Sequence, residues 1–251
     1  MIKNETISSQ EIIQRLKSAP ELYVLASVCT GAPYVACSPE TFDDEIMLFF
    51  DVEEARKKAK EMVESGVLVN IVKLENRQFL LFYTSLYTMG VNAVLISGGG
   101  EERLVQLGEF VRHQKPEHGP DGKVWVENPA LHLTALYYMQ ELRRKPGQEN
   151  SPQLKEWQDE IASHFAKGSF IIPVEKEGNG TAMLKLNDGQ LYHAIFTDAL
   201  EFQKFNKDNK LRAMIVTADK IPQMLAEEAK GVILNPMGVR MPLMIRKPAG
   251  Q

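Results

Sequence analysis

Four polar residues in the second half of the chain have types and positions that suit the binding of a small polar ligand. His193 lies in the apolar strand pattern LYHAIF, and Thr197 and Asp198 follow that pattern where a helix is predicted to begin. Asn235 follows a second apolar run, GVIL. Helix N-termini expose free backbone N–H groups, and α/β folds bind ligands at the carboxyl ends of their strands. We therefore predict a ligand site at His193, Thr197, Asp198 and Asn235.

Two of these residues also have a structural interpretation. Strict alternation places His193 on the same face as Leu191 and Ile195, which favours a histidine held in the core. Asn235 precedes Pro236, and residues of these types are typical of turns. The sequence leaves the ligand-binding and the structural interpretations open.

Nucleophilic catalysis is not indicated. The two cysteines are Cys29 and Cys37, and the first histidine, His113, lies far along the chain from both. A cysteine enzyme needs a base near a thiol of lowered pKa, and the chain has no GxSxG sequence for a serine enzyme. We expect both cysteines to be buried as small apolar side chains, and we expect no catalytic residue. An enzyme whose site is assembled only in the folded chain is the less favoured alternative.

Metal and cofactor sites are not indicated either. His113 and His118 lie in RHQKPEHGPDG, where proline and glycine predict a surface loop rather than the closely spaced ligands of a zinc site. The sequence SGGG at 97–100 follows a strand but lacks the Lys-Ser/Thr pair of a phosphate loop, which favours a tight turn between two strands. We expect no metal and no other cofactor.

Composition limits the remaining classes. The chain has 251 residues, of which 44% are hydrophobic and 25% are charged, so it can form a core. Its net charge of −4 argues against a nucleic-acid binder. The sequence has no apolar run long enough to span a membrane, and its beginning, MIKNETISSQ, lacks the apolar region of a secretory signal. With only two cysteines, this predicts a protein of the reducing cytoplasm, without a membrane or nucleic-acid partner.

The elements that would position the four polar residues are clearest in the second half. Apolar residues at every third or fourth position predict a helix from Ser151 to Lys167, which ends at Gly168. The patterns that follow predict, in order, a strand FIIPV, a hairpin MLKLNDGQLYHAIF, a helix DALEFQKFNK, a strand RAMIV, a helix DKIPQMLAEE and two final strands, KGVILNP and RMPLMIRK.

The first half repeats this order in a degenerate form. It begins with a predicted helix, SSQEIIQRLKS, and a predicted strand, LYVLASV. FFD at 49–51 corresponds to FTD at 196–198, and NAVLIS at 92–97 corresponds to GVILNP at 231–236. We therefore predict an α/β fold, with α+β as the alternative, made of two degenerate copies of a small mixed-sheet domain with flanking helices.

The middle of the chain joins these copies. A loop rich in Pro, Gly and charge is followed by a predicted helix, ALHLTALYYMQELRRK, which has no counterpart at the end of the second copy. The predicted domains are residues 1–127 for copy one, residues 128–150 for a connecting helix and linker, and residues 151–251 for copy two. We expect the connecting helix to pack between the copies.

A family resemblance is carried by four segments. HAIFTDALEFQKF, AMIV and KGVILNPMG in the second copy, and IMLFFDVEEARKKA in the first, resemble the SseB N-terminal domain, a bacterial family named for enhanced serine sensitivity. The resemblance covers most of residues 160–246 and, more weakly, residues 20–112, where Phe50-Asp51 replaces the Phe-Thr-Asp of the second copy. It implies a cytoplasmic α/β domain with no established reaction and no catalytic residues.

These observations predict a non-catalytic cytoplasmic binding or protein-interaction module whose protein partner is unknown. Met237, Met241 and Met244 would suit a partner surface because methionine adapts to varied shapes, although strand core is the favoured interpretation. The alternative is a sensor of a small polar metabolite, such as an amino acid. Its ligand would bind in a cleft between the two copies, at the four polar residues named above.

Overall fold

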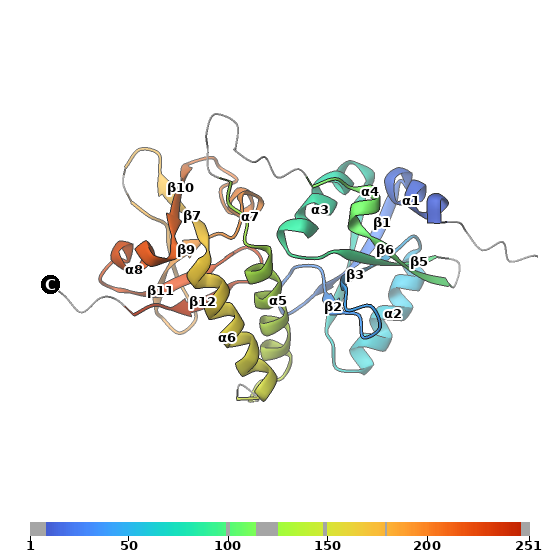
Figure 1. The fold of residues 1–251 in the computed structure, drawn as a ribbon, viewed down its shortest axis with the longest axis horizontal. Helices are drawn as coiled ribbons and strands as arrows, with labels where there is room; N and C mark the ends of the chain where they lie inside the picture. Colours follow the sequence, from blue (N-terminus) through green and yellow to red (C-terminus); the bar gives the residue numbers. More distant parts are fainter. Residues whose placement is uncertain (1–8, 99–100, 114–124, 148–149, 179, 247–251) are drawn as a thin grey trace, which may run out of the picture. The chain divides into compact units, whose positions relative to one another are not determined.

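The computed structural model describes residues 9–98, 101–113, 125–147, 150–178 and 180–246. The chain divides into two compact units, one of residues 1–28 with 32–114 and the other of residues 29–31 with 115–251. In each unit, helices accompany mixed β-sheet (Figure 1). The fold class is therefore α/β, as the sequence predicts.

The first unit contains one mixed sheet. Its strands are β1 (Glu21–Ser27), β2 (Val35–Cys37), β3 (Asp44–Phe49), β4 (Val69–Glu75), β5 (Ala93–Gly98) and β6 (Glu101–Gln106). They pair in the order β4-β1-β3-β5-β6, and β2 pairs with β3. β3 and β5 run parallel, whereas β1 is antiparallel to both of its neighbours. β5 and β6 border the glycine sequence at 97–100, of which residues 99 and 100 lie outside the described residues.

Local signals place the helices of the first unit. The helices are α1 (Ser9–Ser18), α2 (Val52–Glu64), α3 (Asn76–Thr88) and the short α4 (Leu107–Phe110). α1 buries Ile12 and Leu16, which are the apolar positions of its sequence pattern. α2 begins at Asp51, whose carboxylate accepts hydrogen bonds from the backbone N–H groups of Glu53 and Glu54.

The second unit begins with two long helices and continues with two small sheets. Its elements are α5 (Pro129–Arg144), α6 (Pro152–Lys167), β7 (Ser169–Glu175), β8 (Met183–Lys185), β9 (Leu191–Ile195), α7 (Ala199–Phe205), β10 (Leu211–Thr217), a 3-10 turn (Ala218–Lys220), α8 (Ile221–Met224), β11 (Ala229–Leu234) and β12 (Met241–Met244). One sheet has the order β12-β11-β9-β8, and the other pairs β10 with β7. An isolated bridge between Ile171 and Phe196 joins β7 to the end of β9. The core between them includes Tyr192, Ala194 and Ile233.

The strand pairings of the second unit match those of the first. β9 and β11 are parallel, as are β3 and β5. β7 with β10, β8 with β9, and β11 with β12 are antiparallel, as are β1 with β4, β2 with β3, and β5 with β6. The repeated order that the sequence indicates therefore extends to strand pairing, and its origin in a duplication stays a prediction.

Several local expectations differ from the structure. The helix expected over DKIPQMLAEE is reduced to a 3-10 turn and α8, and the backbone is extended from Leu225. Cys37 is exposed and Cys29 is half-buried, so neither is the buried apolar side chain that we expected. β2 has only three residues, which leaves Cys37 at its end beside the chain reversal into β3. His118 lies outside the described residues.

The helix that we expected to connect the copies clusters with the second unit, where α5 lies beside α6 (Figure 1). α5 buries residues on more than one side, including Leu131, Ala135, Tyr138 and Met139. A helix that is buried on several sides has no single polar stripe, and the sequence of α5 has none either. Among the described residues, no helix is long and apolar enough to cross a membrane.

Candidate functional site

The structure brings together three of the four polar residues that we predicted as a ligand site. Thr197 and Asp198 follow β9, and Asn235 follows β11. These two strands are parallel neighbours whose last residues, Ile195 and Leu234, are paired, so their carboxyl ends lie side by side. This placement follows from strand order and register, which also explains why residues far apart in sequence meet here.

Asn235 is bonded to Thr197 at two points. Its Oδ1 accepts a hydrogen bond from the Thr197 backbone N–H at 3.0 Å, and its Nδ2 donates to Thr197 Oγ1 at 2.8 Å. Asn235 adopts a left-handed conformation, with φ at +47°, and its own backbone carbonyl accepts from Gly238 and Arg240. Asparagine tolerates this conformation better than most residues, so one residue both turns the chain and ties the two strand ends.

His132 of α5 and Asp198 complete the cluster. The Thr197 hydroxyl donates to Asp198 Oδ2 at 2.8 Å, and His132 Nδ1 lies 3.3 Å from Thr197 Oγ1. Because the Thr197 proton is directed at Asp198, the proton between Nδ1 and Oγ1 belongs to His132. His132 Nδ1 also lies 3.7 Å from Asp198 Oδ2. The sequence offered no signal for His132, because its partners lie 65 residues further along the chain.

The other carboxylate oxygen of Asp198, Oδ1, caps the N-terminus of α7. Oδ1 accepts hydrogen bonds from the backbone N–H groups of Leu200 and Glu201, at 2.9 and 3.0 Å, so Asp198 is the N-cap of α7. Burial raises the pKa of Asp198, but the hydrogen bond and charge of His132, with the bonds from Glu201 and Thr197, outweigh it. The net effect lowers the pKa of Asp198 below its ordinary value of 3.8.

His193 lies apart from this cluster in its hydrogen bonding. Its Nε2 accepts the backbone N–H of Ala226 at 2.9 Å, and its Nδ1 lies 2.9 Å from Thr181 Oγ1. A nitrogen that accepts carries no proton, so the ring proton lies on Nδ1 and points at Thr181. His193 is 5% exposed, and its ring joins the segment before β8 to the segment after α8. The bond also explains the short α8, because it directs the Ala226 N–H away from the helix.

The chemistry of this cluster is that of a buried polar network. Thr197 and Asn235 are 0% exposed, and His132 and Asp198 are 1% exposed. The network holds the ends of β9 and β11 against α5, and a ligand at these residues would have to displace bonds within the chain. The ligand-binding role of His193, Thr197, Asp198 and Asn235 stays a prediction.

Glu201 of α7 is a further buried carboxylate, which we did not predict. It is 3% exposed, its Oε1 accepts from Lys204 Nζ at 2.5 Å, and its Oε2 has no hydrogen-bond partner among the described residues. A β-carbon added at Gly238 would lie 2.8 Å from Oε2, so this oxygen packs against the turn after β11. Within the described part of the chain, no group of three His, Cys, Asp or Glu side chains could hold a metal ion.

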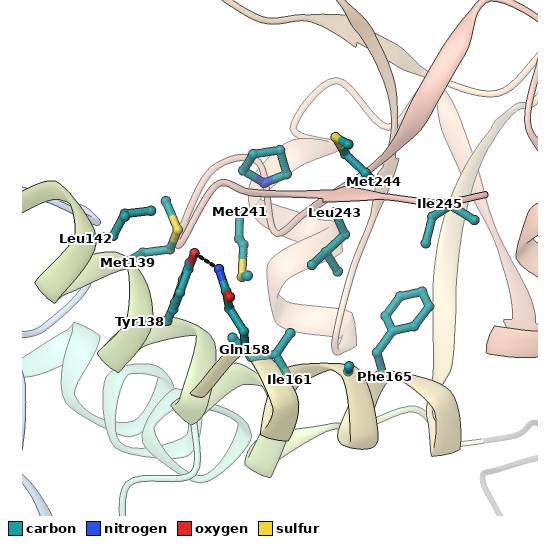
Figure 2. Close-up of a pocket in the computed structure, with 12 residues that line it drawn as sticks. Tyr138, Met139, Leu142, Gln158, Ile161, Phe165, Met241, Leu243, Met244 and Ile245 are labelled. Atoms are coloured by element: carbon teal, nitrogen blue, oxygen red, sulfur yellow. Dashed lines mark hydrogen bonds between the residues drawn. The ribbon is translucent and has the colours of Figure 1, made fainter. Parts of the chain in front are cut away.

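A second site lies where α5, α6 and β12 line an apolar pocket (Figure 2). Its volume is about 390 Å³. The lining residues are Tyr138, Met139 and Leu142 of α5, Gln158, Ile161, Ala162 and Phe165 of α6, and Met241, Pro242, Leu243, Met244 and Ile245 in and after β12. Most of these side chains are apolar, so the pocket suits a partner with apolar surface.

One polar pair belongs to this pocket. Gln158 Nε2 donates a hydrogen bond to the Tyr138 hydroxyl oxygen at 2.6 Å (Figure 2). Tyr138 is 7% exposed, whereas Gln158 is exposed to solvent. The two residues come from different helices, so neither the pair nor the pocket was visible in the sequence. Met241 and Met244 were noted there as adaptable apolar positions, and both line the pocket.

No protein-family model matches the chain, and no curated protein matches it. Among solved structures, the chain is similar to Tic22 of Anabaena, which is described as a protein of protein transport. The identity is 12%, the TM-score is 0.23, and the likeness covers 90% of this chain and 93% of that chain. It is also similar to Tic22 from Plasmodium falciparum, with 11% identity, a TM-score of 0.23 and coverage of 88% and 89%. At these values neither likeness bears on the site.

Proposed function

We propose that the chain is a non-catalytic binding module of the cytoplasm, as its resemblance to the SseB family implies. Its partner would bind in the apolar pocket formed by α5, α6 and β12. The observation that carries this proposal is the polar side chain of Tyr138, which is 7% exposed and lines an apolar pocket of about 390 Å³. Ligand sites typically combine apolar walls with a few placed polar groups. Both cysteines are free thiols, which suits a reducing compartment.

The alternative is a sensor of a small polar metabolite at His193, Thr197, Asp198 and Asn235. It is favoured by the position of three of them at the carboxyl ends of parallel strands. It is disfavoured by their burial and by the hydrogen bonds that they make to one another. The pocket requires no such rearrangement, so it is the preferred site.

Binding in the pocket is tested with a fluorescent apolar dye, 1-anilinonaphthalene-8-sulfonate. Ala162 lines the pocket and is exposed, so Ala162→Trp would obstruct the pocket from its mouth with little change to the core. Ala166 is an exposed alanine of the same helix outside the lining, so Ala166→Trp is the matched control. We expect the folded wild type and the control to bind the dye with equal affinity and the pocket variant to bind it at least about tenfold more weakly, because its apolar area is no longer available.

A thermal-shift screen against amino acids separates the two candidates. A ligand present at about 100 times its dissociation constant adds roughly 2.7 kcal/mol of stability. The metabolite sensor would be supported if one amino-acid ligand raises the unfolding temperature, if Ala162→Trp leaves that increase unaltered, and if Thr197→Val removes it. Equal dye binding by the Ala162→Trp and Ala166→Trp variants would refute the pocket as the binding site.

A further inference from the structure

The pocket of the second unit differs from the matching place in the first unit. In the first unit, α1, β5 and β6 stand where α6, β11 and β12 stand in the second, and the cavity there is only about 10 Å³. The guanidinium of Arg15 lies 3.8 Å above the ring centre of Phe50 in that place. The shared strand pairing therefore does not by itself create a cavity. The pocket of the second unit also has α5 as a wall, and the matching elements of the first unit, α1 to β6, include no helix that corresponds to α5.

We propose that this pocket binds a small amphiphile, an unbranched or ring-containing apolar body with a single carboxylate or carbonyl head. The apolar body would lie against Ile161, Leu243 and Met241, and the head would accept a hydrogen bond from the Tyr138 hydroxyl. This inference rests on the proposed function, because it names the ligand class of the same site.

The size of the pocket limits the apolar body. The volume of about 390 Å³ lies within the range of small-molecule sites and below that needed for a large cofactor. At roughly 30 Å³ for each water-sized group, it holds on the order of a dozen non-hydrogen atoms. The walls include three methionines, Met139, Met241 and Met244, whose flexible thioethers adapt to ligands of slightly different shape.

The Tyr138 hydroxyl determines which kind of head group the ligand would carry. Its oxygen accepts from Gln158 Nε2, and its own proton has no acceptor among the described residues. Tyr138 is more than nine-tenths buried and Gln158 is exposed, so the pair lies where the apolar interior meets solvent. A ligand with an acceptor head would satisfy the free proton there, while a wholly apolar ligand would cover it and bind at least about fivefold more weakly.

The same observations disfavour a peptide as the occupant. An apolar helix face laid over the pocket would remove water from the Tyr138 proton without supplying an acceptor. Strand addition at β12 is also disfavoured. The Ile245 N–H donates to Lys230 of β11, so by alternation Pro242 turns its backbone away from β11, and proline has no N–H to offer a new strand.

The test measures displacement of the dye from the full-length protein by straight-chain carboxylates of about six to about fourteen carbons, below their micelle concentrations. We expect affinity to rise about fourfold with each added CH₂, because each buried CH₂ contributes about 0.8 kcal/mol, and to level off near a dozen carbons. n-Decylamine, whose protonated head has no acceptor, should bind more weakly than the carboxylate of equal length.

Two tyrosine variants isolate the head group. Tyr138→Phe removes the proposed donor and keeps the ring, and we expect it to weaken carboxylate binding about tenfold while n-decylamine binds no more weakly than it does to the wild type. Tyr137→Phe is the matched control, because Tyr137 is the neighbouring tyrosine, stacks on Trp157 and is outside the pocket lining. Circular dichroism and the unfolding temperature confirm that each variant is folded before binding is compared.

The outcomes separate this inference from the proposed function. The amphiphile proposal would be overturned if affinity does not depend on the chain length of the carboxylate. It would also be overturned if Tyr138→Phe and Tyr137→Phe change carboxylate binding equally. If Ala162→Trp weakens dye binding but only an apolar helical peptide displaces the dye, the pocket is a protein-docking site and the amphiphile is refuted. If Ala162→Trp leaves dye binding unchanged, the proposed function itself fails.

Discussion

Asn235 holds Thr197 by two hydrogen bonds, one to its backbone N–H at 3.0 Å and one to its hydroxyl at 2.8 Å. The two residues lie 38 positions apart and follow adjacent parallel strands. Their side chains are completely buried. This pair therefore fixes the carboxyl ends of β9 and β11 relative to one another, and the position of Asp198 at the beginning of α7 follows from it.

Removing the Asn235 side chain should destabilise the second unit. Asn235→Gly keeps the left-handed backbone but leaves the Thr197 N–H buried without its acceptor, so we expect a loss of about 2 kcal/mol. Asn235→Ala should cost about 1 kcal/mol more, because a β-carbon disfavours positive φ. Urea denaturation measures both. If the glycine variant is as stable as the wild type, the pair does not hold the strand ends.

Stability should fall in acid through Asp198. Its pKa is lower in the folded chain than its ordinary value of 3.8, so its contribution is complete above that value and is lost as pH falls through the folded pKa. Asp198→Asn keeps a residue that can cap α7 but removes the charge, and we expect it to cost about 2 kcal/mol at neutral pH. The gap between wild type and variant in the free energy of unfolding should narrow below the ordinary pKa. A gap that widens in acid would contradict this assignment.

Gly231 of β11 should not tolerate alanine. A β-carbon there would lie 2.0 Å from the carbonyl oxygen of Leu243, so β12 must move away from β11. We expect Gly231→Ala to cost about 3 kcal/mol in thermal or urea unfolding. Since Leu243 is part of the pocket wall, dye binding should change as well.

A matched glycine in the first unit serves as the control for Gly231→Ala. A β-carbon at Gly108 of α4 meets only the Tyr87 hydroxyl, at 3.9 Å. Gly108→Ala should therefore be neutral or add up to about 1 kcal/mol of stability through helix propensity. A loss at Gly108 equal to that at Gly231 would mean that the close approach of Leu243 is not the cause.

Cys37 should react slowly for an exposed thiol. Partial burial of the sulfur raises the pKa of the Cys37 thiol above the ordinary value of 9.0, and the negative charges of Asp44, Glu45 and Asp43 raise this pKa further. Less thiolate is therefore present at neutral pH. In a Cys29→Ser background, we expect slower reaction with an aromatic disulfide reagent than a free cysteine peptide shows. Salt and Asp44→Asn should each speed the reaction, because they weaken the negative field. A rate equal to that of the peptide would contradict the raised pKa.

The elements of the fold were predictable where their signals are local. Ser151 caps α6 by accepting from the Leu154 N–H, and Asp198 caps α7 in the same way. Both bonds join residues within three positions, so residue type and spacing are enough to predict them. The order of helices and strands, and hence the α/β class, follows from apolar periodicity of the same short range.

The structural role of a residue could not be predicted where its contacts are with residues far away in the sequence. His132 meets Thr197 across 65 positions, so nothing near either residue in the sequence indicates their contact. α8 is shorter than its pattern indicates because the Ala226 N–H is taken by His193, which lies 33 positions earlier. Cys37 has the residue type of a buried position but ends a short strand at the surface.

The sequence by itself therefore determined the α/β class, the element order and the caps, because these depend on interactions within a turn or two of the chain. Only the tertiary structure decided which polar residues are buried together and where a pocket remains open. Tyr138 and Gln158 meet because α5 packs on α6, and their pocket exists because β12 lies over both helices without filling the space between them. Cavities and buried networks depend on the shapes of side chains from several elements, which no single segment specifies.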